Sequence, residues 1–225
     1  MMKKNKIFIA CDSTNILKIK KIIRYTSNTK LKIGYKFGLE FLNSKNGRNF
    51  VSKLKNKIIF ADLKLHDIPN TCVSTIKAIK DLKVNYLTIH ISSGLQALKA
   101  AKKVSGSIRL VGVSILTSLD NKELKKIGFN KDVKKLVLHQ AKLANKAKLD
   151  AIVCSAQEAK IVKKIFKKEI ITPGIRLNSN SNDQKRVLTP KQAFINGSDA
   201  LVIGREITKN DIKKNIQKLI DHLKK

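Results

Sequence analysis

The 225-residue sequence predicts an α/β fold: a single (β/α)8 barrel that spans residues 1–225 as one domain. Short apolar or β-branched runs recur eight times, longer segments of helical periodicity separate them, and polar residues follow the runs at their carboxyl ends. Near-continuous apolar strands between amphipathic helices are typical of a parallel sheet covered by helices. Eight such units would fill a compact barrel, and a doubly wound open sheet is the alternative.

The expected strands are short and rich in Ile, Val and Leu. In chain order they are KIFIAC (6–11), LKIGYK (31–36), KIIFADLK (57–64), YLTIHI (86–91), RLVGVSI (109–115), AIVCS (151–155), EIITP (169–173) and ALVIG (200–204). Helical periodicity is clearest over 71–83 and 132–148, where apolar residues recur on one face. The Asn- and Ser-rich stretch 176–190 is either a tolerated surface insertion or, at the carboxyl rim of a barrel, a mobile lid.

Charge is the most unusual feature of the composition. Lys and Arg number 48 against 16 Asp and Glu, a formal net charge of +32. Only six of the basic residues are arginines, which supply the bidentate contacts of nucleic-acid interfaces, and the lysines are spread over the whole chain. We therefore expect a solvated lysine-rich surface and no nucleic-acid partner. A positive field would still attract a small anionic substrate.

The sequence also bears on compartment and redox chemistry. No apolar run approaches the roughly 20 residues that span a bilayer, and the apolar run after the basic start is too short for a signal-peptide core. We expect no membrane partner and a cytoplasmic location. The three cysteines, Cys11, Cys72 and Cys154, lie in apolar sequence without metal-binding or redox spacing, so we expect them in the core.

The stretch FADLKLHDIPNT (60–71) places charged residues at the end of the third strand. Because strand side chains alternate, Asp62 and Lys64 point to the same side, at the end of the barrel where catalytic groups are kept. An ion pair that merely plugs the barrel is the alternative. Polar groups at other strand ends favour a functional site, namely Asp12, Lys36, His90, Thr117, TPGIR (172–176) and IGR (203–205).

The last two strands suggest a phosphate site. Gly204 would let the backbone approach a ligand, and Arg205 could bind an oxyanion beside the start of the following helix. Loops after the seventh and eighth strands bind phosphate in many barrels, so we expect a phosphorylated substrate. Arg176 and Gln184 would assist from the loop.

Taken together, these motifs resemble the orotidine 5′-phosphate decarboxylase family over most of the chain. The matching segments are IACDST (9–14), KFGLEF (36–41), FADLKLHDIPNT (60–71), LTS (116–118), VCSAQEA (153–159), TPGIR (172–176), DQKRVLTP (183–190) and VIGREIT (202–208). The third is highly specific. The shorter pattern of Asp62, Lys64 and Asp67 within it also resembles a wider group of enzymes, which contains 3-keto-gulonate 6-phosphate decarboxylase and hexulose phosphate synthase.

The resemblance implies conversion of orotidine monophosphate (OMP) to UMP without metal or organic cofactor. Lys64 would protonate C6 of the pyrimidine, Asp62 would lie against the departing carboxylate, and Lys36 would hold Asp62. The implied catalytic residues are Lys36, Asp62, Lys64 and Asp67. The implied substrate-binding residues are Asp12, Lys36, Asp62, Asp67, Ile68, Thr71, Thr117, Pro173, Arg176, Gln184, Gly204 and Arg205.

The resemblance further implies a homodimer with shared active sites, since Asp67 and Thr71 of this family reach into the partner's site. Without the resemblance, Thr71 would be a helix cap or first-turn residue. The second strand contains two Lys-x-Gly units, and we choose Lys36 over Lys32 because GLEF follows it. IHISSG (89–94) and Glu206 depart from the family pattern. His66 and His90 fit no zinc spacing, and we expect hydrogen-bonded structural roles for them.

Two other functions remain open at this point. A sugar-phosphate decarboxylase or aldolase of the wider group would use the same aspartates to bind magnesium, and its activity would depend on divalent metal. A basic nucleic-acid-binding domain is supported by charge alone. Its binding to random DNA would fall steeply with salt and would survive removal of Lys64.

Overall fold

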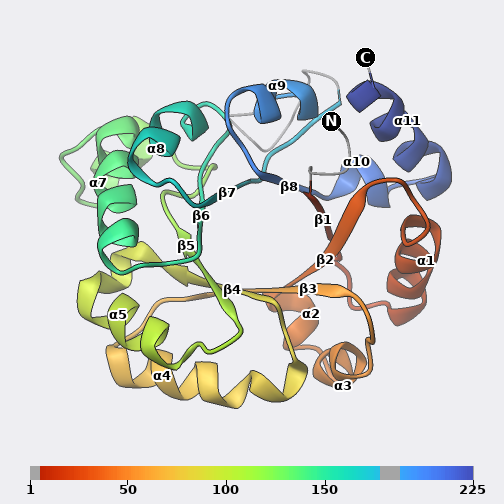
Figure 1. Ribbon diagram of the computed structural model, residues 1–225, viewed down its shortest axis with the longest axis horizontal. Helices are drawn as coiled ribbons and strands as arrows, with labels where there is room; N and C mark the ends of the chain where they lie inside the picture. Colours follow the sequence, from red (N-terminus) through yellow and green to blue (C-terminus); the bar gives the residue numbers. More distant parts are fainter. Residues whose placement is uncertain (1–5, 178–187, 225) are drawn as a thin grey trace.

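A computed structural model describes residues 6–177 and 188–224, in which eight parallel strands close into a barrel in chain order (Figure 1). Strand β1 pairs with both β2 and β8, which excludes an open sheet. The predicted (β/α)8, or TIM, barrel is thus confirmed, and each predicted strand ends within two residues of an observed one. The strands are β1 (Lys6–Ala10), β2 (Lys32–Gly38), β3 (Ile58–Leu65), β4 (Tyr86–His90), β5 (Arg109–Val113), β6 (Ala151–Val153), β7 (Glu169–Thr172) and β8 (Ala200–Ile203).

Helices surround the barrel on the outside (Figure 1). They are α1 (Ile16–Thr26), α2 (Leu39–Leu42), α3 (Gly47–Ser52), α4 (Pro69–Ala78), α5 (Gly94–Val104), α6 (Asn121–Lys126), α7 (Val133–Lys146), α8 (Ala159–Ile165), α9 (Pro190–Ile195), α10 (Arg205–Thr208) and α11 (Ile212–Lys224), with 3-10 turns at Lys80–Leu82 and Ile91–Ser93. The helix expected over 71–83 is divided, because the chain leaves the α-helix after Ala78 and ends in a left-handed residue, Lys83. The helix expected over 132–148 is α7, capped by the Asp132 side chain.

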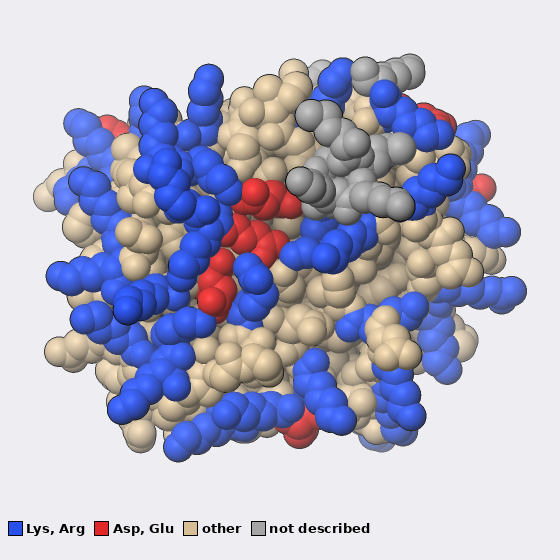
Figure 2. Space-filling view, in the orientation of Figure 1, with Lys and Arg blue, Asp and Glu red and all other residues tan. Residues whose placement is uncertain are grey.

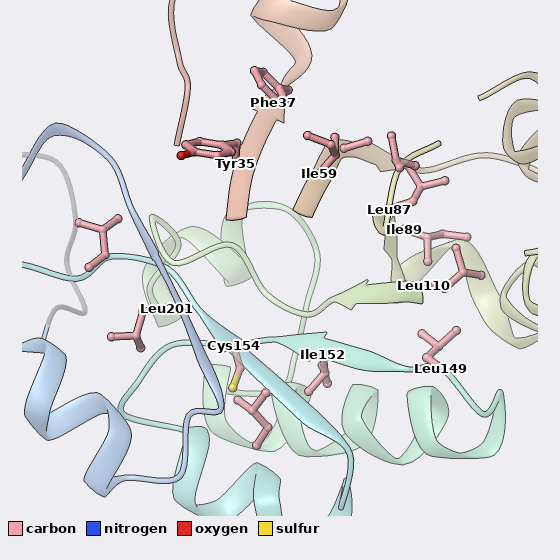
Figure 3. Packing of buried hydrophobic residues seen from close by; sticks show 14 of the residues in the cluster. Tyr35, Phe37, Ile59, Leu87, Ile89, Leu110, Leu149, Ile152, Cys154 and Leu201 are labelled. Atoms are coloured by element: carbon pink, nitrogen blue, oxygen red, sulfur yellow. The ribbon is translucent and has the colours of Figure 1, made fainter. Parts of the chain in front are cut away.

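Apolar side chains form two separate layers of core. The first lies between strands and helices, and Figure 3 shows part of it, including Tyr35, Leu87 and Ile152. The second fills the barrel interior, where Phe8 packs edge-on against Phe60 and Tyr86, with ring centroids 4.9 and 5.1 Å apart. Because these side chains fill the barrel interior below the rim formed by the carboxyl ends of the strands, a ligand would bind at that rim.

Gly34 is required by this interior layer. A Cβ atom at Gly34 would lie 2.7 Å from a carbon of the Phe8 ring, well inside van der Waals contact. Strand β2 therefore has no side chain where β1 places its largest one.

Polar side chains from the amino ends of three other strands converge on Glu169, the first residue of β7. Glu169 contacts Lys6 at 2.7 Å, Arg109 at 2.8 Å and the Tyr86 hydroxyl at 3.1 Å, and its side chain is 10% exposed. Lys6 also donates a hydrogen bond to the Tyr86 hydroxyl. At the amino end of a barrel, such a cluster stabilises the fold and lies far from the carboxyl rim.

The surface is as basic as the composition predicts. On the face shown in Figure 2, Lys and Arg side chains lie on all sides, one group of acidic side chains lies near the centre, and a few others lie at the edges. Dispersed lysines agree with a solvated surface better than with one nucleic-acid-binding stripe. None of the helices in the described ranges is both long and apolar enough to cross a membrane. All three cysteines are buried and free, as expected for core residues.

Candidate active site

A cavity of about 340 Å³ opens at the carboxyl ends of the strands. Its polar walls come from the rim residues that the sequence singled out, and its apolar walls come from inward-facing strand residues. The predicted residues among its lining are Asp12, Lys36, Asp62, Lys64, Thr117, Pro173, Arg176, Gly204 and Arg205. One barrel thus brings together nine of the thirteen residues predicted for the site.

Asp62 is the centre of the charged network in this cavity. One of its oxygens, Oδ2, accepts Lys64 Nζ at 2.8 Å and lies 3.2 Å from Lys36 Nζ. Lys36 Nζ also donates to Oδ1 of Asp12 at 3.2 Å. The side chains of Asp62 and Lys36 are 11% and 12% exposed, whereas that of Lys64 is 35% exposed. Lys64 is therefore the ammonium group of this network that is most open to a ligand.

The network fixes the charges of its members. Burial would raise the pKa of Asp62, but Lys36 and Lys64 outweigh it and hold that pKa below its ordinary value. Burial would likewise lower the pKa of Lys36, but Asp62 and Asp12 raise it above its ordinary value. At neutral pH, Asp62 is therefore an anion and Lys36 a cation.

A β-bulge in β3 shapes the approach of Lys64. Ala61 pairs with Leu87 of β4 and Leu65 pairs with Ile89, so Asp62, Leu63 and Lys64 lie opposite Thr88 alone. Lys64 has a φ of 50°, in the left-handed region that residues other than glycine seldom adopt. Such conformations cost on the order of 1–3 kcal/mol and cluster at functional sites. The bulge turns Lys64 back toward Asp62.

The structure distinguishes the two lysines of the second strand. Lys36 lies four residues along β2, inside the cavity, within ion-pair distance of Asp12 and Asp62. Lys32 is the first residue of β2 and lines another cavity, at the amino end of the barrel, together with Lys6 and Glu169. The geometry thus supports the choice of Lys36 as the site lysine.

The side of the cavity formed by β7 and β8 carries the two arginines. Arg176 and Arg205 both line it, beside Gly204 and Pro173. Arg176 lies 3.9 Å from Glu206, which also accepts the backbone N–H of Leu177 at 3.3 Å. Glu206, one of the departures from the family pattern, therefore holds the start of the loop after β7.

That loop leaves the described part of the chain soon after Leu177. Its two ends are joined by a bridge between Ile175 and Leu188, in which Arg176 N–H donates to Leu188 O at 3.2 Å. Gln184 and the rest of residues 178–187, which make up most of the predicted lid (176–190), lie outside the described residues.

Asp67, Ile68 and Thr71 do not line the cavity of their own chain in the described structure. Asp67 and Thr71 are exposed, on the loop after β3 and in the first turn of α4, and Ile68 is 66% exposed. Asp67 Oδ1 accepts the N–H of Ile68 at 2.7 Å. These three residues form an outward-facing surface next to the site.

His66 and His90 stack beside the bulge with ring centroids 5.1 Å apart. Ser92 Oγ lies 3.3 Å from Nε2 of His66. Burial lowers the pKa of His90, and the nearby His66 and Lys64 lower it further, so His90 is neutral at neutral pH. Within residues 6–177 and 188–224, no group of three or more His, Cys, Asp or Glu side chains could hold a metal ion.

The cavity also contains residues that sequence reasoning missed. Its apolar lining includes Phe60, Val113, Val153 and Val202, which share the inward-facing side of their strands with the polar rim. Their alternation could have identified them. Thr88, which binds both Asp62 and the backbone of Lys64, gives no such signal, since it reads as one more β-branched strand residue.

Comparison with known proteins finds a family model, curated relatives and solved structures that are similar to this chain. The model of the "Orotidine 5'-phosphate decarboxylase / HUMPS family" matches residues 5–218. The orotidine 5′-phosphate decarboxylase of Wolbachia pipientis subsp. Culex pipiens (strain wPip) is 42% identical over 223 residues, 96% of this chain and 97% of that protein. The one from Ehrlichia chaffeensis (strain ATCC CRL-10679 / Arkansas) is 46% identical over 180 residues, 77% of this chain and 78% of that protein. A crystal structure of orotidine 5′-phosphate decarboxylase from Lactobacillus acidophilus has a TM-score of 0.82 and 30% identity, covering 98% of this chain and 99% of that one.

Proposed function

We propose that this chain, which belongs to the orotidine 5′-phosphate decarboxylase / HUMPS family, is a carboxy-lyase that converts OMP to UMP and carbon dioxide. The observation that carries this proposal is the contact of Lys64 and Lys36 with one carboxylate oxygen of Asp62, inside a cavity that also contains two arginines. The reaction would serve de novo pyrimidine biosynthesis, in the cytoplasm.

Lys64 would donate the proton in this reaction. As the bond between C6 of the pyrimidine and the carboxylate carbon breaks, carbon dioxide leaves and the electron pair stays on C6. The Lys64 ammonium then gives a proton to C6, and the neutral amine regains one from solvent. A cation held where negative charge develops stabilises the transition state. At 35% exposure, the Lys64 side chain is open enough to reach a ligand.

Asp62 and Lys36 would each have a supporting role in this step. Asp62 is an anion at neutral pH and would lie against the carboxylate of the substrate, which raises the energy of the bound substrate relative to the transition state. Lys36 would keep Asp62 in place and contact the ribose, with Asp12 binding a ribose hydroxyl. The step as written needs neither metal nor organic cofactor, since the pyrimidine ring and Lys64 handle the charge.

The other end of the cavity suits the phosphate. Arg176 and Arg205 provide cationic donors there, and Gly204 provides a backbone without a side chain. A Cβ atom at Gly204 would meet the protein only at ordinary contact distance, 3.5 Å from Ala10 Cβ. Thr117 would face the base, Pro173 would line the pocket, and Gln184 would bridge phosphate and base.

We further propose a homodimer with shared active sites. Asp67, Ile68 and Thr71 lie on the outward surface beside the cavity, and a 66% exposed Ile68 is an apolar side chain that a partner subunit would cover. Subunit mixing tests this arrangement. Lys64→Ala and Asp67→Ala homodimers should each be nearly inactive, whereas co-refolded mixtures should recover about a quarter of the wild-type sites, because each heterodimer regains one complete site. Mixtures that stay inactive, or a monomer in sedimentation, would refute the shared site.

Substrate and metal dependence test the proposed function. We expect purified protein to consume OMP, followed by its ultraviolet absorbance, at the same rate in EDTA as in magnesium. Sugar phosphates of the wider family should give no turnover in either buffer. Folded protein that ignores OMP but processes sugar phosphates with magnesium would contradict the proposal.

A further inference from the structure

Thr88 occupies a special position in the barrel. It is the residue of β4 that lies opposite the bulge of β3, where the regular ladder between the two strands is interrupted. A bulge leaves backbone groups of the longer strand without a ladder partner, and buried groups of this kind must find one elsewhere. Thr88 is 1% exposed, and it is not among the described residues that line the cavity.

The Thr88 hydroxyl supplies the missing partner and also reaches the charged network. Its Oγ1 accepts the backbone N–H of Lys64 at 2.7 Å and donates to Oδ1 of Asp62 at 3.1 Å. The second oxygen of Asp62, Oδ2, then faces Lys64 Nζ and Lys36 Nζ. Thr88, Asp62 and Lys64 thus form a closed ring of hydrogen bonds.

Each bond of this ring has a separate consequence. The bond from Lys64 N–H holds Lys64 in its left-handed backbone conformation, which sets the direction of its side chain. The bond to Oδ1 fixes the rotation of the Asp62 carboxylate, so that Oδ2 stays between the two lysines. Loss of the hydroxyl would leave a buried N–H and a carboxylate oxygen each one partner short.

We propose that Thr88 is a positioning residue of the active site, which sets the relative placement of Lys64 and Asp62 without touching the substrate. This inference rests on the proposed decarboxylation, and it assigns to a buried strand residue part of the preorganisation that the reaction requires. Positioning of this kind acts on the transition state more than on substrate binding, because the proposed phosphate contacts, Arg176 and Arg205, come from the side of the cavity formed by β7 and β8.

Two substitutions separate the hydroxyl from the shape of the side chain. Thr88→Val keeps the branched shape and removes the hydroxyl, whereas Thr88→Ser keeps the hydroxyl and removes a methyl group. We expect Thr88→Val to lower kcat for OMP about 10- to 100-fold with KM changed less than about threefold, since small misplacements of catalytic groups have effects of this size. Thr88→Ser should retain kcat within about threefold of wild type, because its hydroxyl can make both bonds. Thermal melts of both variants show whether the barrel stays folded.

A second measurement does not depend on turnover. Titration of the Asp62 carboxyl by NMR should show a higher pKa in Thr88→Val than in wild type or Thr88→Ser, because a hydrogen bond to the charged form is lost. If wild type turns over no OMP, the proposed function fails, and this titration still decides whether Thr88 sets the network. An unchanged Asp62 pKa in folded Thr88→Val overturns the inference. Equal losses of kcat in Val and Ser variants, or a loss confined to KM, would also overturn it.

Discussion

Lys64 is bound to the carboxylate of Asp62 at both of its oxygens. Its Nζ donates directly to Oδ2 at 2.8 Å, and its backbone N–H reaches Oδ1 through the hydroxyl of Thr88. Asp62 and Lys64, which are two positions apart on β3, are thereby held in one relative position, although a lysine side chain is normally flexible.

Removing the charge of Asp62 should impair the reaction and leave the barrel folded. Asp62→Asn keeps the shape of the side chain but ends the repulsion of the substrate carboxylate and weakens the hold on Lys64. We expect kcat for OMP to fall at least about 100-fold, comparable to the loss of a preorganised electrostatic group. Stopped assays of the purified variant measure it, with Asp81→Asn, an exposed partner of Arg48, as control. Activity within a few-fold of wild type would exclude a role for the charge.

The charged network should also give stability a defined pH dependence. Since the pKa of folded Asp62 lies below its ordinary value of 3.8, its contribution is complete well above that value and is lost as pH falls through the folded pKa. We expect the difference in unfolding free energy between wild type and Asp62→Asn to shrink as pH falls from about 6 toward about 3, the range in which carboxyl groups ordinarily titrate. Urea unfolding at several pH values measures this difference. A gap that widens with acid would contradict the assignment.

Lys36 should make the stability of the protein depend on pH at the alkaline end of the range. The pKa of Lys36 is raised above its ordinary value of 10.5, so its contribution is present below 10.5 and lost as pH rises through the folded pKa. Lys36→Met should therefore differ most from wild type at neutral pH and less at strongly alkaline pH. Lys32→Met, at the amino end of β2, serves as the matched control and should leave activity unchanged. Loss of OMP turnover in Lys32→Met with normal turnover in Lys36→Met would reverse our assignment.

The amino-end cluster should affect stability alone. Glu169→Gln removes the acid that pairs with Lys6 and Arg109, and we expect a loss of about 2 kcal/mol, less than for a fully buried pair because Arg109 is half exposed. Glu123→Gln, which breaks an exposed pair with Lys126, should cost no more than about 0.5 kcal/mol. Urea denaturation measures both. The kcat for OMP should be unchanged, and a large fall in kcat would show that this cluster communicates with the site.

Arg205 should matter only for substrates that carry a phosphate. We expect Arg205→Ala to raise KM for OMP by about 10- to 100-fold, the effect of losing charge-assisted hydrogen bonds. Turnover of orotidine, which lacks the phosphate, should be the same in Arg205→Ala as in wild type. Arg24→Ala, an arginine of α1 outside the cavity, is the control for a general loss of positive charge. Equal effects of the two substitutions would indicate that only the overall field contributes.

Much of the fold follows from the sequence because its signals are local. Apolar runs and turn residues place all eight strands, and their period of two places Asp62 and Lys64 on the inner side of the barrel. Lys36 and Asp12 join them because adjacent parallel strands bring their carboxyl ends to one rim.

Other features depend on relations that a single sequence does not contain. The bulge is a difference in register between β3 and β4, and no residue type in β3 predicts it. The role of Thr88 is therefore visible only when the pairing of the two strands is known. The helical periodicity likewise continues past Ala78, where the α-helix ends and a 3-10 turn begins. Asp67, Ile68 and Thr71 are exposed and do not line the cavity of their own chain in the described structure, and what they contact in an assembly is a property of two chains.

Lys64→Ala tests the proposed proton donor most directly, through its effect on OMP turnover in EDTA, with thermal melts to show that wild type and variant are equally folded. We predict metal-independent turnover in wild type and a loss of activity in Lys64→Ala with the fold retained. Wild-type rates in folded Lys64→Ala would contradict the assignment of Lys64 as the proton donor, and no OMP turnover in folded wild type would contradict the proposed function itself.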